Sequence, residues 1–327
     1  MQVTVIVPVR NEATAIRATL TSLLNQNFPA DEYEVIVADG GSEDETVAIV
    51  REFQSTHSNL KLLFNPKRWS SAARNLGVRH MRGKVCVVVD GHCQVPSRDY
   101  IRNVMTAFGE SGADCLGRPQ PLDIANPTPF QQAVSAARSS RLGHNPDSDI
   151  YSDQPKYVEP QSTAIAYHRD VFRRVGLFDE HFDACEDVEF NQRVFDAGFR
   201  CWFTPKLTIV YHPRKTLRGL STQLMRYGTG RARLAKKHPR SLTLPALVPP
   251  LWCVWLVLGA VISLLIPNMI WLYVASLMLY ASAILGGSLM LARKQTANVG
   301  VRIPGVLLGI HFGFGWGFLR ESLRLRS

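Results

Sequence analysis

The sequence predicts an α/β module with a mostly parallel sheet and helices on both faces, followed by a basic amphipathic helix and a transmembrane hairpin. Three observations predict this class. Strand and helix signals alternate over the first 120 residues. Residues 205–240 contain ten basic residues and no acidic one. Residues 241–292 contain no Asp, Glu, Lys or Arg, and one membrane span needs only about 20 residues.

The first half of the chain supplies the predicted sheet. We expect strands at 3–7, 34–38, 60–64 and 85–89, separated by helices at 13–24, 44–53 and 70–81. The strands lack polar alternation, which is typical of a parallel sheet covered on both faces. Ligands of such sheets bind beyond the carboxyl ends of the strands. Pro8, Asp39 and Asp90 follow three of these strands, so the sequence places them along one edge.

The second half divides into three predicted regions. We expect helices near 128–140, 170–175 and 186–197, a strand at 163–167, and a basic amphipathic helix at 215–237. We therefore place a catalytic-type α/β domain at 1–213, a basic interfacial helix at 214–244 and a membrane region at 245–327. Within the last region, Pro267-Asn268 separates two expected spans at about 246–266 and 269–292.

The distribution of charge matters more than the net charge of +10. Residues 1–204 contain 21 basic and 26 acidic residues, so the α/β module itself is acidic. A nucleic-acid-binding domain usually carries its basic patch on the folded module, so we expect no nucleic acid partner. The basic segment directly precedes the apolar tail, which predicts contact with membrane lipids.

A third apolar segment, 303–319, is shorter and contains five glycines. If it crossed the membrane, Arg320, Arg324 and Arg326 would lie on the side opposite the basic segment, against the positive-inside rule. We therefore expect this segment to be re-entrant or interfacial, or to form a contact in a homo-oligomer. Six cysteines without C-x-x-C spacing fit a reduced, cytosolic module.

The motif V-V-V-D-G-H at 87–92 predicts a metal site. A carboxylate at a strand end and a second ligand two residues later can hold a divalent cation on a diphosphate. Because the second ligand is His92, Mn²⁺ suits the pair better than Mg²⁺. The alternative is a turn aspartate with a partly buried histidine. His212 is a candidate third ligand, and a surface histidine near lipid headgroups is the alternative for it.

Three further motifs carry polar chemistry. In V-I-V-A-D-G-G-S-E-D-E-T at 35–46, Asp39 can accept a hydrogen bond from a nucleobase imide or a ribose hydroxyl. The alternative is that Asp39 only stabilises a turn. In C-E-D-V-E-F at 185–190, Glu186 and Asp187 raise each other's proton affinity, which suits one of them to be a general base. Ordinary helix N-terminal charge is the alternative. In Q-L-M-R-Y at 223–227, Arg226 can pair with a diphosphate and Tyr227 can stack on a sugar, unless the helix is only interfacial.

These motifs, in this order, resemble the family 2 glycosyltransferases with a GT-A fold, over about residues 1–240. P-V-R-N-E at 8–12, R-N-x-G at 74–77 and V-G-L-F-D-E at 175–180 strengthen the resemblance. It implies an enzyme in which Asp187 is the catalytic base with Glu186 beside it, and in which Asp90 and His92 bind the metal and diphosphate. The implied donor-binding residues are Pro8, Arg10, Glu12, Asp39, Arg74, Asp90 and Arg226, and the implied acceptor residues are Gln223 and Tyr227.

The tail narrows the resemblance. Q-x-x-R-Y-G, a membrane hairpin and H-F-G-F-G-W-G-F-L at 311–319 are similar to the bacterial exopolysaccharide glycosyltransferases of succinoglycan type. This implies inverting transfer of a single sugar from a nucleotide-diphosphate sugar, a UDP-sugar, to a polyprenyl-diphosphate-linked saccharide. It also implies Mn²⁺ or Mg²⁺ as the cofactor, and we expect a multi-pass protein of the cytoplasmic membrane whose catalytic domain lies in the cytosol.

Two alternatives stay open. Q-x-x-R-Y is close to the Q-x-x-R-W of processive synthases such as those of cellulose and hyaluronan, although two or three spans are too few for one chain to enclose a polymer channel. The other alternative is a membrane-anchored, non-catalytic protein that binds nucleotide sugars.

Overall fold

The computed structural model describes residues 1–122, 124–144 and 149–324, called the described residues below. The chain forms two compact units. The first contains Met1–Leu122 and Asp149–His212, and the second contains Asp123–Ser148 and Pro213–Ser327. The sequence analysis assigned residues 1–213 to one domain, whereas the first unit of the structure leaves out the segment 123–148.

The first unit contains a mixed, mostly parallel sheet of eight strands in the order β3-β2-β1-β4-β7-β5-β8-β6. β1 pairs in parallel with both β2 and β4, whereas β7 is antiparallel to its neighbours β4 and β5. The strands are β1 Val3–Val9, β2 Tyr33–Asp39, β3 Leu60–Phe64, β4 Val85–Val88, β5 Cys115–Gly117, β6 Lys156–Val158, β7 Ala164–His168 and β8 Cys201–Phe203. The predicted fold class is confirmed.

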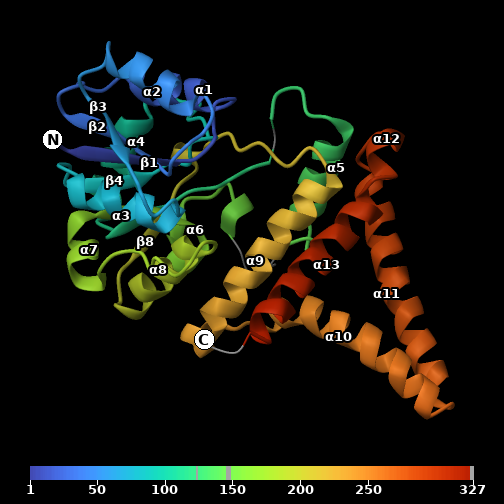
Figure 1. Cartoon of the computed structure of the whole chain (residues 1–327). Coiled ribbons are helices and arrows are strands. Elements are labelled where there is room, and N and C mark those ends of the chain that lie inside the picture. The colour runs from blue at the N-terminus through green and yellow to red at the C-terminus, as the bar shows by residue number, and fades with distance from the viewer. Residues whose placement is uncertain (123, 145–148, 325–327) are drawn as a thin grey trace. The chain divides into compact units, whose positions relative to one another are not determined.

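Helices cover both faces of this sheet (Figure 1). They are α1 Ile16–Leu24, α2 Thr46–Gln54, α3 Ser70–His80, α4 Tyr100–Ser111, α7 Arg169–Val175 and α8 Glu186–Asp196, with a short α6 Pro160–Thr163. Val5 and Val7 of β1 belong to the core that α1 and α4 cover, and Ile6 belongs to the core that α8 covers. Successive side chains of a strand point to opposite faces. A strand buried on both faces therefore has a continuous apolar sequence.

The observed strand β1 extends beyond its predicted end, through Pro8 to Val9. Pro8 stays in register with Ala38 of β2, and its carbonyl oxygen accepts a hydrogen bond from the backbone N–H of Gly91 at 3.3 Å. Proline cannot donate a backbone hydrogen bond, but it can still accept one. The strand therefore delivers its last residues directly to the edge where the motifs meet.

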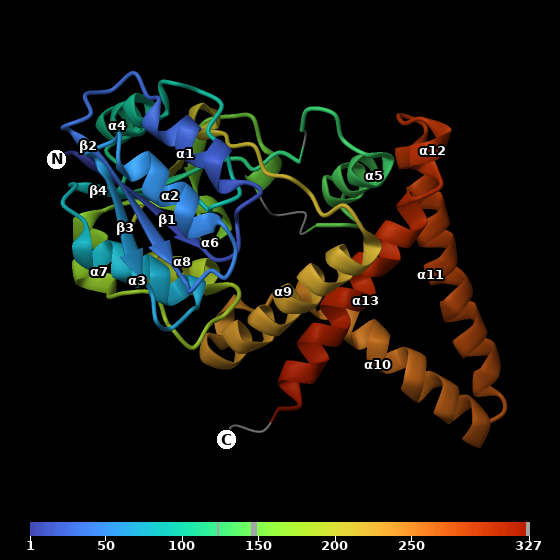
Figure 2. The same cartoon turned by 45° about the horizontal axis from the view of Figure 1, so that its top comes forward.

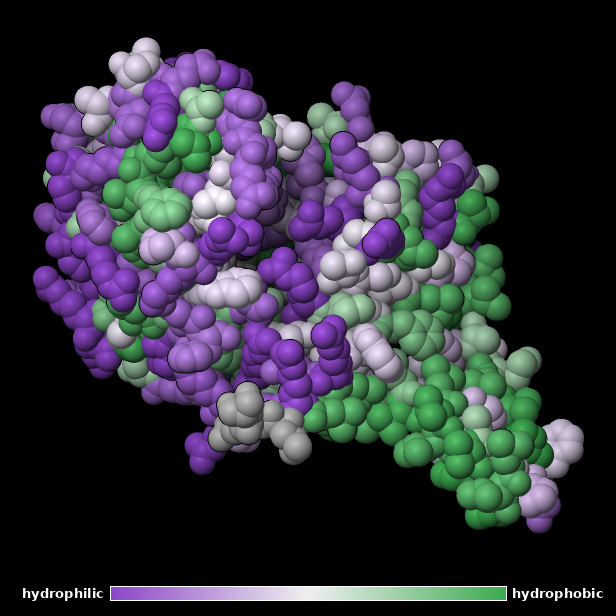
Figure 3. Space-filling view, viewed as in Figure 1, coloured by the Kyte–Doolittle hydropathy of each residue, from purple (hydrophilic) through white to green (hydrophobic). Residues whose placement is uncertain are grey.

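The second unit is helical. It contains α5 Pro129–Arg138, α9 Leu217–Lys237, α10 Leu244–Leu265, α11 Met269–Ala292, α12 Ala297–Gly300 and α13 Ile303–Ser322. Among the described residues, Leu244–Leu265, Met269–Ala292 and Ala297–Ser322 are long and apolar enough to cross a membrane. The hydrophobic surface of α10 and α11 is visible in Figure 3. The first two segments agree closely with the predicted hairpin.

Glycines let α9 and α13 pack closely side by side, as Figures 1 and 2 both show. A Cβ atom on Gly313 would lie 2.8 Å from the carbonyl oxygen of Ser221, and one on Gly317 would lie 2.0 Å from that of Met225. The contact of α9 with α13 thus moves four residues toward the C-terminus of both helices at once, so the two helices run parallel. An ion pair of 3.0 Å between Arg233 and Glu321 continues the contact beyond the glycines.

Candidate active site

The carboxyl ends of the parallel strands bring the predicted motifs to one edge of the sheet. Asp39, the last residue of β2, pairs in register with Val9 of β1. Asp90 follows β4 by two residues, and the chain beside it bonds to the end of β1 through Gly91. The structure therefore places Pro8, Asp39 and Asp90 along a common edge, as the sequence predicted.

The motifs P-V-R-N-E and D-G-G-S-E-D-E-T are held together by hydrogen bonds. The Asn11 N–H donates to Ser42 Oγ at 2.9 Å, and Asn11 Oδ1 accepts from the N–H of Glu43 at 2.8 Å. The Glu12 N–H donates to Thr46 Oγ1 at 2.8 Å. Asn11 has a φ of 56°, a left-handed conformation that asparagine tolerates. The two loops thus form one structural element at the edge.

Asp39 holds the turn that follows it. Its carboxylate accepts from the N–H of Gly41 at 3.0 Å, the N–H of Ser42 at 3.1 Å and the Ser42 hydroxyl at 2.5 Å, and the residue is 4% exposed. The turn role that the sequence left as an alternative is therefore present. The donor-binding role of Asp39 stays a prediction, as does that of the exposed Arg10.

Asp90 and His92 form the core of a candidate metal centre. Ligand atoms of Asp90, His92 and Cys93 lie within 4.8 Å of one another. Burial raises the pKa of the Cys93 thiol well above its usual value, so the thiol stays protonated and is a poor ligand. An aspartate and an imidazole are donors that suit Mn²⁺, so the residues fit the predicted cation.

Glu12 lies beside His92, which the sequence did not predict. Its Oε1 atom is 3.1 Å from His92 Nδ1. When that nitrogen donates to the carboxylate, Nε2 carries the lone pair that a metal binds, an arrangement common around metal-binding histidines. The resemblance implied that Glu12 binds the donor, and in the structure its side chain contacts His92, the candidate metal ligand.

His212 does not join the Asp90, His92 and Cys93 group in the part of the chain that the structure describes. It is exposed and follows Tyr211, whose ring contacts the His92 ring edge-on at 5.5 Å between centroids. The third-ligand role of His212 therefore stays a prediction.

Arg74 joins the metal side of the site to the acid pair. Its guanidinium lies 3.3 Å from Asp90 Oδ1 and 3.3 Å from Glu186 Oε1, and the residue is only 7% exposed. Burial alone would raise the pKa of Asp90, but Arg74, His92 and Arg118 hold it below its usual value. Asp90 therefore stays ionised, as a metal ligand must be.

The two adjacent acids at the start of α8 have different environments. Glu186 is 6% exposed and paired with Arg74, and burial together with the charge of Asp187 raises its pKa despite that pairing. Asp187 is half-buried, and its Oδ1 accepts a local hydrogen bond from Val188 N–H at 2.9 Å. Asp187 is therefore the accessible carboxylate, and Glu186 positions Arg74.

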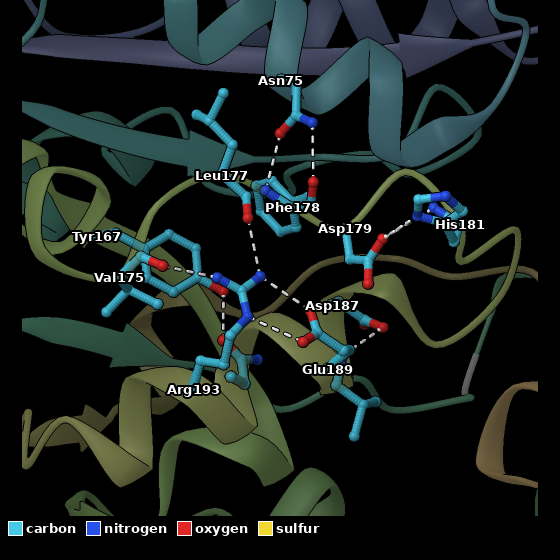
Figure 4. A network of polar contacts seen from close by, with 12 residues as sticks. Asn75, Tyr167, Val175, Leu177, Phe178, Asp179, His181, Asp187, Glu189 and Arg193 are labelled. Carbon is cyan, nitrogen blue, oxygen red and sulfur yellow. Dashed lines mark hydrogen bonds and ion pairs between the residues drawn. The ribbon is translucent and has the colours of Figure 1, made fainter. Parts of the chain in front are cut away.

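Backbone clamps that the sequence analysis missed hold α8 in place (Figure 4). Asn75 donates to the Phe178 carbonyl at 2.9 Å and accepts from the Phe178 N–H at 2.8 Å. Arg193 bonds both carboxylate oxygens of Glu189 at 2.8 Å and also donates to the carbonyls of Val175 and Leu177. The i, i+4 spacing of Glu189 and Arg193 was a signal for the second clamp.

Comparisons with known proteins identify the family. A family model described as glycosyl transferase family 2 matches residues 4–176, just over half of the chain. The chain belongs to glycosyl transferase family 2. It is therefore a glycosyltransferase, as the sequence predicted.

Relatives of this glycosyltransferase match nearly its whole length. It is 30% identical over 98% of its length to the succinoglycan biosynthesis protein ExoA of Rhizobium meliloti, 95% of which is covered. It is 22% identical to a dolichyl N-acetyl-α-D-glucosaminyl phosphate diacetamido-dideoxyglucuronosyltransferase of Methanococcus voltae, with 99% and 98% of the two chains covered.

A solved structure has the same fold. The mannosyltransferase PcManGT of Pyrobaculum calidifontis, in complex with GDP-Man and Mn²⁺, matches with a TM-score of 0.61 at 21% identity. The match covers 96% of this glycosyltransferase and 87% of PcManGT. It shows that the GT-A-like sheet followed by long helices recurs in a related architecture.

The remaining predicted site residues of the glycosyltransferase lie on α9, in the second unit. Gln223 is buried and donates from Nε2 to the Tyr227 hydroxyl at 3.1 Å, whereas Arg226 is exposed. The structure thus brings Gln223 and Tyr227 together. Their acceptor role, and the donor role of Arg226, stay predictions.

Proposed function

We propose that this glycosyltransferase transfers a single sugar, with inversion, from a UDP-sugar to a polyprenyl-diphosphate-linked saccharide at the cytosolic face of the cytoplasmic membrane. The observation that carries the proposal is the Arg74 bridge. The guanidinium of Arg74 contacts both Asp90, the candidate metal ligand, and Glu186, which stands next to the candidate base Asp187 in α8. A site for the diphosphate leaving group and a candidate base therefore adjoin each other.

The reaction follows from the roles of these side chains. Asp187 accepts the proton of the acceptor hydroxyl, whose oxygen attacks the anomeric carbon as the bond to the donor diphosphate breaks. A single displacement of this kind inverts the anomeric centre. Asp90 and His92 would hold Mn²⁺, which supplies charge neutralisation for the departing diphosphate. Arg74, held between Asp90 and Glu186, keeps the two halves of the site in fixed geometry.

The relatives support the acceptor class. The ExoA relative is named for succinoglycan biosynthesis, and the Methanococcus voltae relative is named for transfer to a dolichyl-phosphate-linked sugar. We infer the same acceptor chemistry here, a saccharide carried on a lipid phosphate or diphosphate. Membership of an enzyme family, together with the accessible Asp187, favours catalysis over the non-catalytic alternative.

Nucleotide release tests the proposed function. The purified chain, in detergent with bacterial membranes as the acceptor source, is incubated with UDP-, GDP- and dTDP-sugars. We expect release of UDP, a requirement for divalent metal that EDTA abolishes and Mn²⁺ restores, and a glycolipid product one sugar longer by mass spectrometry. A ladder of products would instead establish a processive synthase. Absence of release from every donor would contradict the proposal.

The packing of α9 on α13 supports the membrane topology that we propose. α9 carries six Arg and Lys residues over its 21 residues, too many for a helix that crosses the hydrocarbon core. Because α13 runs parallel to α9 in close contact, we expect both helices to have the same orientation relative to the membrane. We infer that the pair lies in the interface and that only α10 and α11 span. The chain then returns to the cytosolic side at Arg293 and Lys294.

Cysteine labelling tests this topology. In intact spheroplasts, a membrane-impermeant maleimide should fail to label Ser322→Cys at the end of α13. It should label Asn268→Cys in the exposed turn between α10 and α11. In inside-out vesicles the pattern should reverse. Labelling of Ser322→Cys from outside would contradict an interfacial α13, and the unsubstituted chain measures the background from native cysteines.

A further inference from the structure

Arg118 lies at the same sheet edge as Asp90. β7 is antiparallel to both β4 and β5, and Ala166 of β7 pairs with Val87 on one side and Leu116 on the other. The carboxyl ends of β4 and β5 therefore meet at one edge, two strand spacings or about 10 Å apart. Arg118 directly follows β5, so an arginine side chain can reach the space beside Asp90.

This arginine is buried and makes no direct ion pair among the described residues. It is 5% exposed, and its Nη1 donates a hydrogen bond to the carbonyl oxygen of the adjacent Pro119 at 3.4 Å. Its Nε has no hydrogen-bond partner in the part of the chain that the structure describes. Arg193, by contrast, bonds both oxygens of a carboxylate at 2.8 Å. A buried guanidinium is costly unless a negative group meets it, so the fold leaves this cation for a ligand.

The charge of Arg118 acts on the metal side of the site. Arg118 is one of the charges that hold the pKa of Asp90 below its usual value. Burial raises the pKa of Cys93 and raises the pKa of Tyr100 to about 12, and the positive charge of Arg118 opposes both increases. Along the edge the strands run β2, β1, β4, β7, β5. Asp90 therefore lies between Asp39 on one side and Arg118 on the other.

We propose that Arg118 is a donor-binding residue that contacts the diphosphate of the nucleotide sugar from the side opposite the nucleoside. The inference rests on the proposed function. A guanidinium matches phosphate oxygens through paired N–H donors. Asp90 already has Arg74 as an ion-pair partner at 3.3 Å, so Arg118 is not required to neutralise it. Its charge then stabilises the leaving group in the reaction.

Binding of Mn²⁺ and of Mn²⁺-pyrophosphate to the full chain in detergent tests the proposal without knowledge of the nucleobase. In calorimetry, Arg118→Gln should bind Mn²⁺-pyrophosphate at least about tenfold more weakly than the wild type does. Binding of Mn²⁺ alone should stay equal or become tighter, because a cation beside Asp90 has been removed. Arg102→Gln is the matched control: this exposed arginine pairs with Asp99, and its loss should change neither affinity.

The sign of the pyrophosphate effect decides between the two roles of Arg118. If Arg118 were only a counter-ion of Asp90, Arg118→Gln would bind Mn²⁺-pyrophosphate as tightly as the wild type or tighter, which would overturn the inference. If Arg118→Gln does not fold, Arg118→Lys keeps the charge but loses the paired donors, and it should still bind pyrophosphate several-fold more weakly. Failure of the wild-type chain to bind Mn²⁺-pyrophosphate would overturn the proposed function itself.

Discussion

Replacing Asp187 with Asn should lower the rate of sugar transfer by about 10²- to 10⁴-fold while donor binding stays intact. The amide cannot accept the acceptor proton, yet it nearly preserves the shape of the side chain. The Asp187 side chain accepts a hydrogen bond from the neighbouring Val188 N–H, and an amide oxygen can keep that hydrogen bond. The loss should therefore appear in kcat and not in the donor Kd.

The measurement compares single-turnover transfer with donor affinity in the same preparation. Asp196→Asn is the matched control, because Asp196 is an exposed acid at the other end of α8. It should leave both quantities unchanged. Near-normal turnover of Asp187→Asn would contradict the assignment of Asp187 as the catalytic base. Glu186→Gln should behave differently, with weaker donor binding, because it releases Arg74 from one of its two partners.

Asp90→Asn should abolish metal-dependent transfer, with a fall in rate of at least about 10²-fold. The substitution removes the anionic ligand of the candidate metal centre and leaves the buried Arg74 with Glu186 alone. The apparent affinity for Mn²⁺, measured by electron paramagnetic resonance, should fall in parallel. Asp99→Asn, nine residues further along the chain and paired with Arg102, should not affect it. An unchanged Mn²⁺ dependence of Asp90→Asn would contradict the metal assignment.

The sheet was predictable where strands are long and buried on both faces. β1, β2, β3 and β4 fall within two residues of their predicted ends, because such strands have continuous apolar sequences. The strands β5 and β6 contain three residues each, too few to show a period. The antiparallel direction of β7 depends on the chain path, which no local pattern records.

The site was predictable at the level of motifs but not of contacts. Asp90, His92, Glu186 and Asp187 stand at element ends, which the sequence marks. The contact of Glu12 with His92 joins residues 80 positions apart, and the Asn75 clamp joins residues 103 apart. Such pairs arise only when the sheet brings its strands together. The lone Arg118 belongs to no motif, so only its burial identifies it.

Helix α3 imposes a constraint on recombination between relatives. By sequence α3 belongs with β1 to β4, whose ends carry the candidate donor-binding residues. Its neighbouring residues Arg74 and Asn75 nevertheless contact Glu186 and Phe178, which lie in the later segment that carries the candidate base. A chimera joined between residues 92 and 164 would bring together a helix and a loop that were selected in different proteins. We expect such exchanges to succeed only when the 175–186 segment is inherited together with α3.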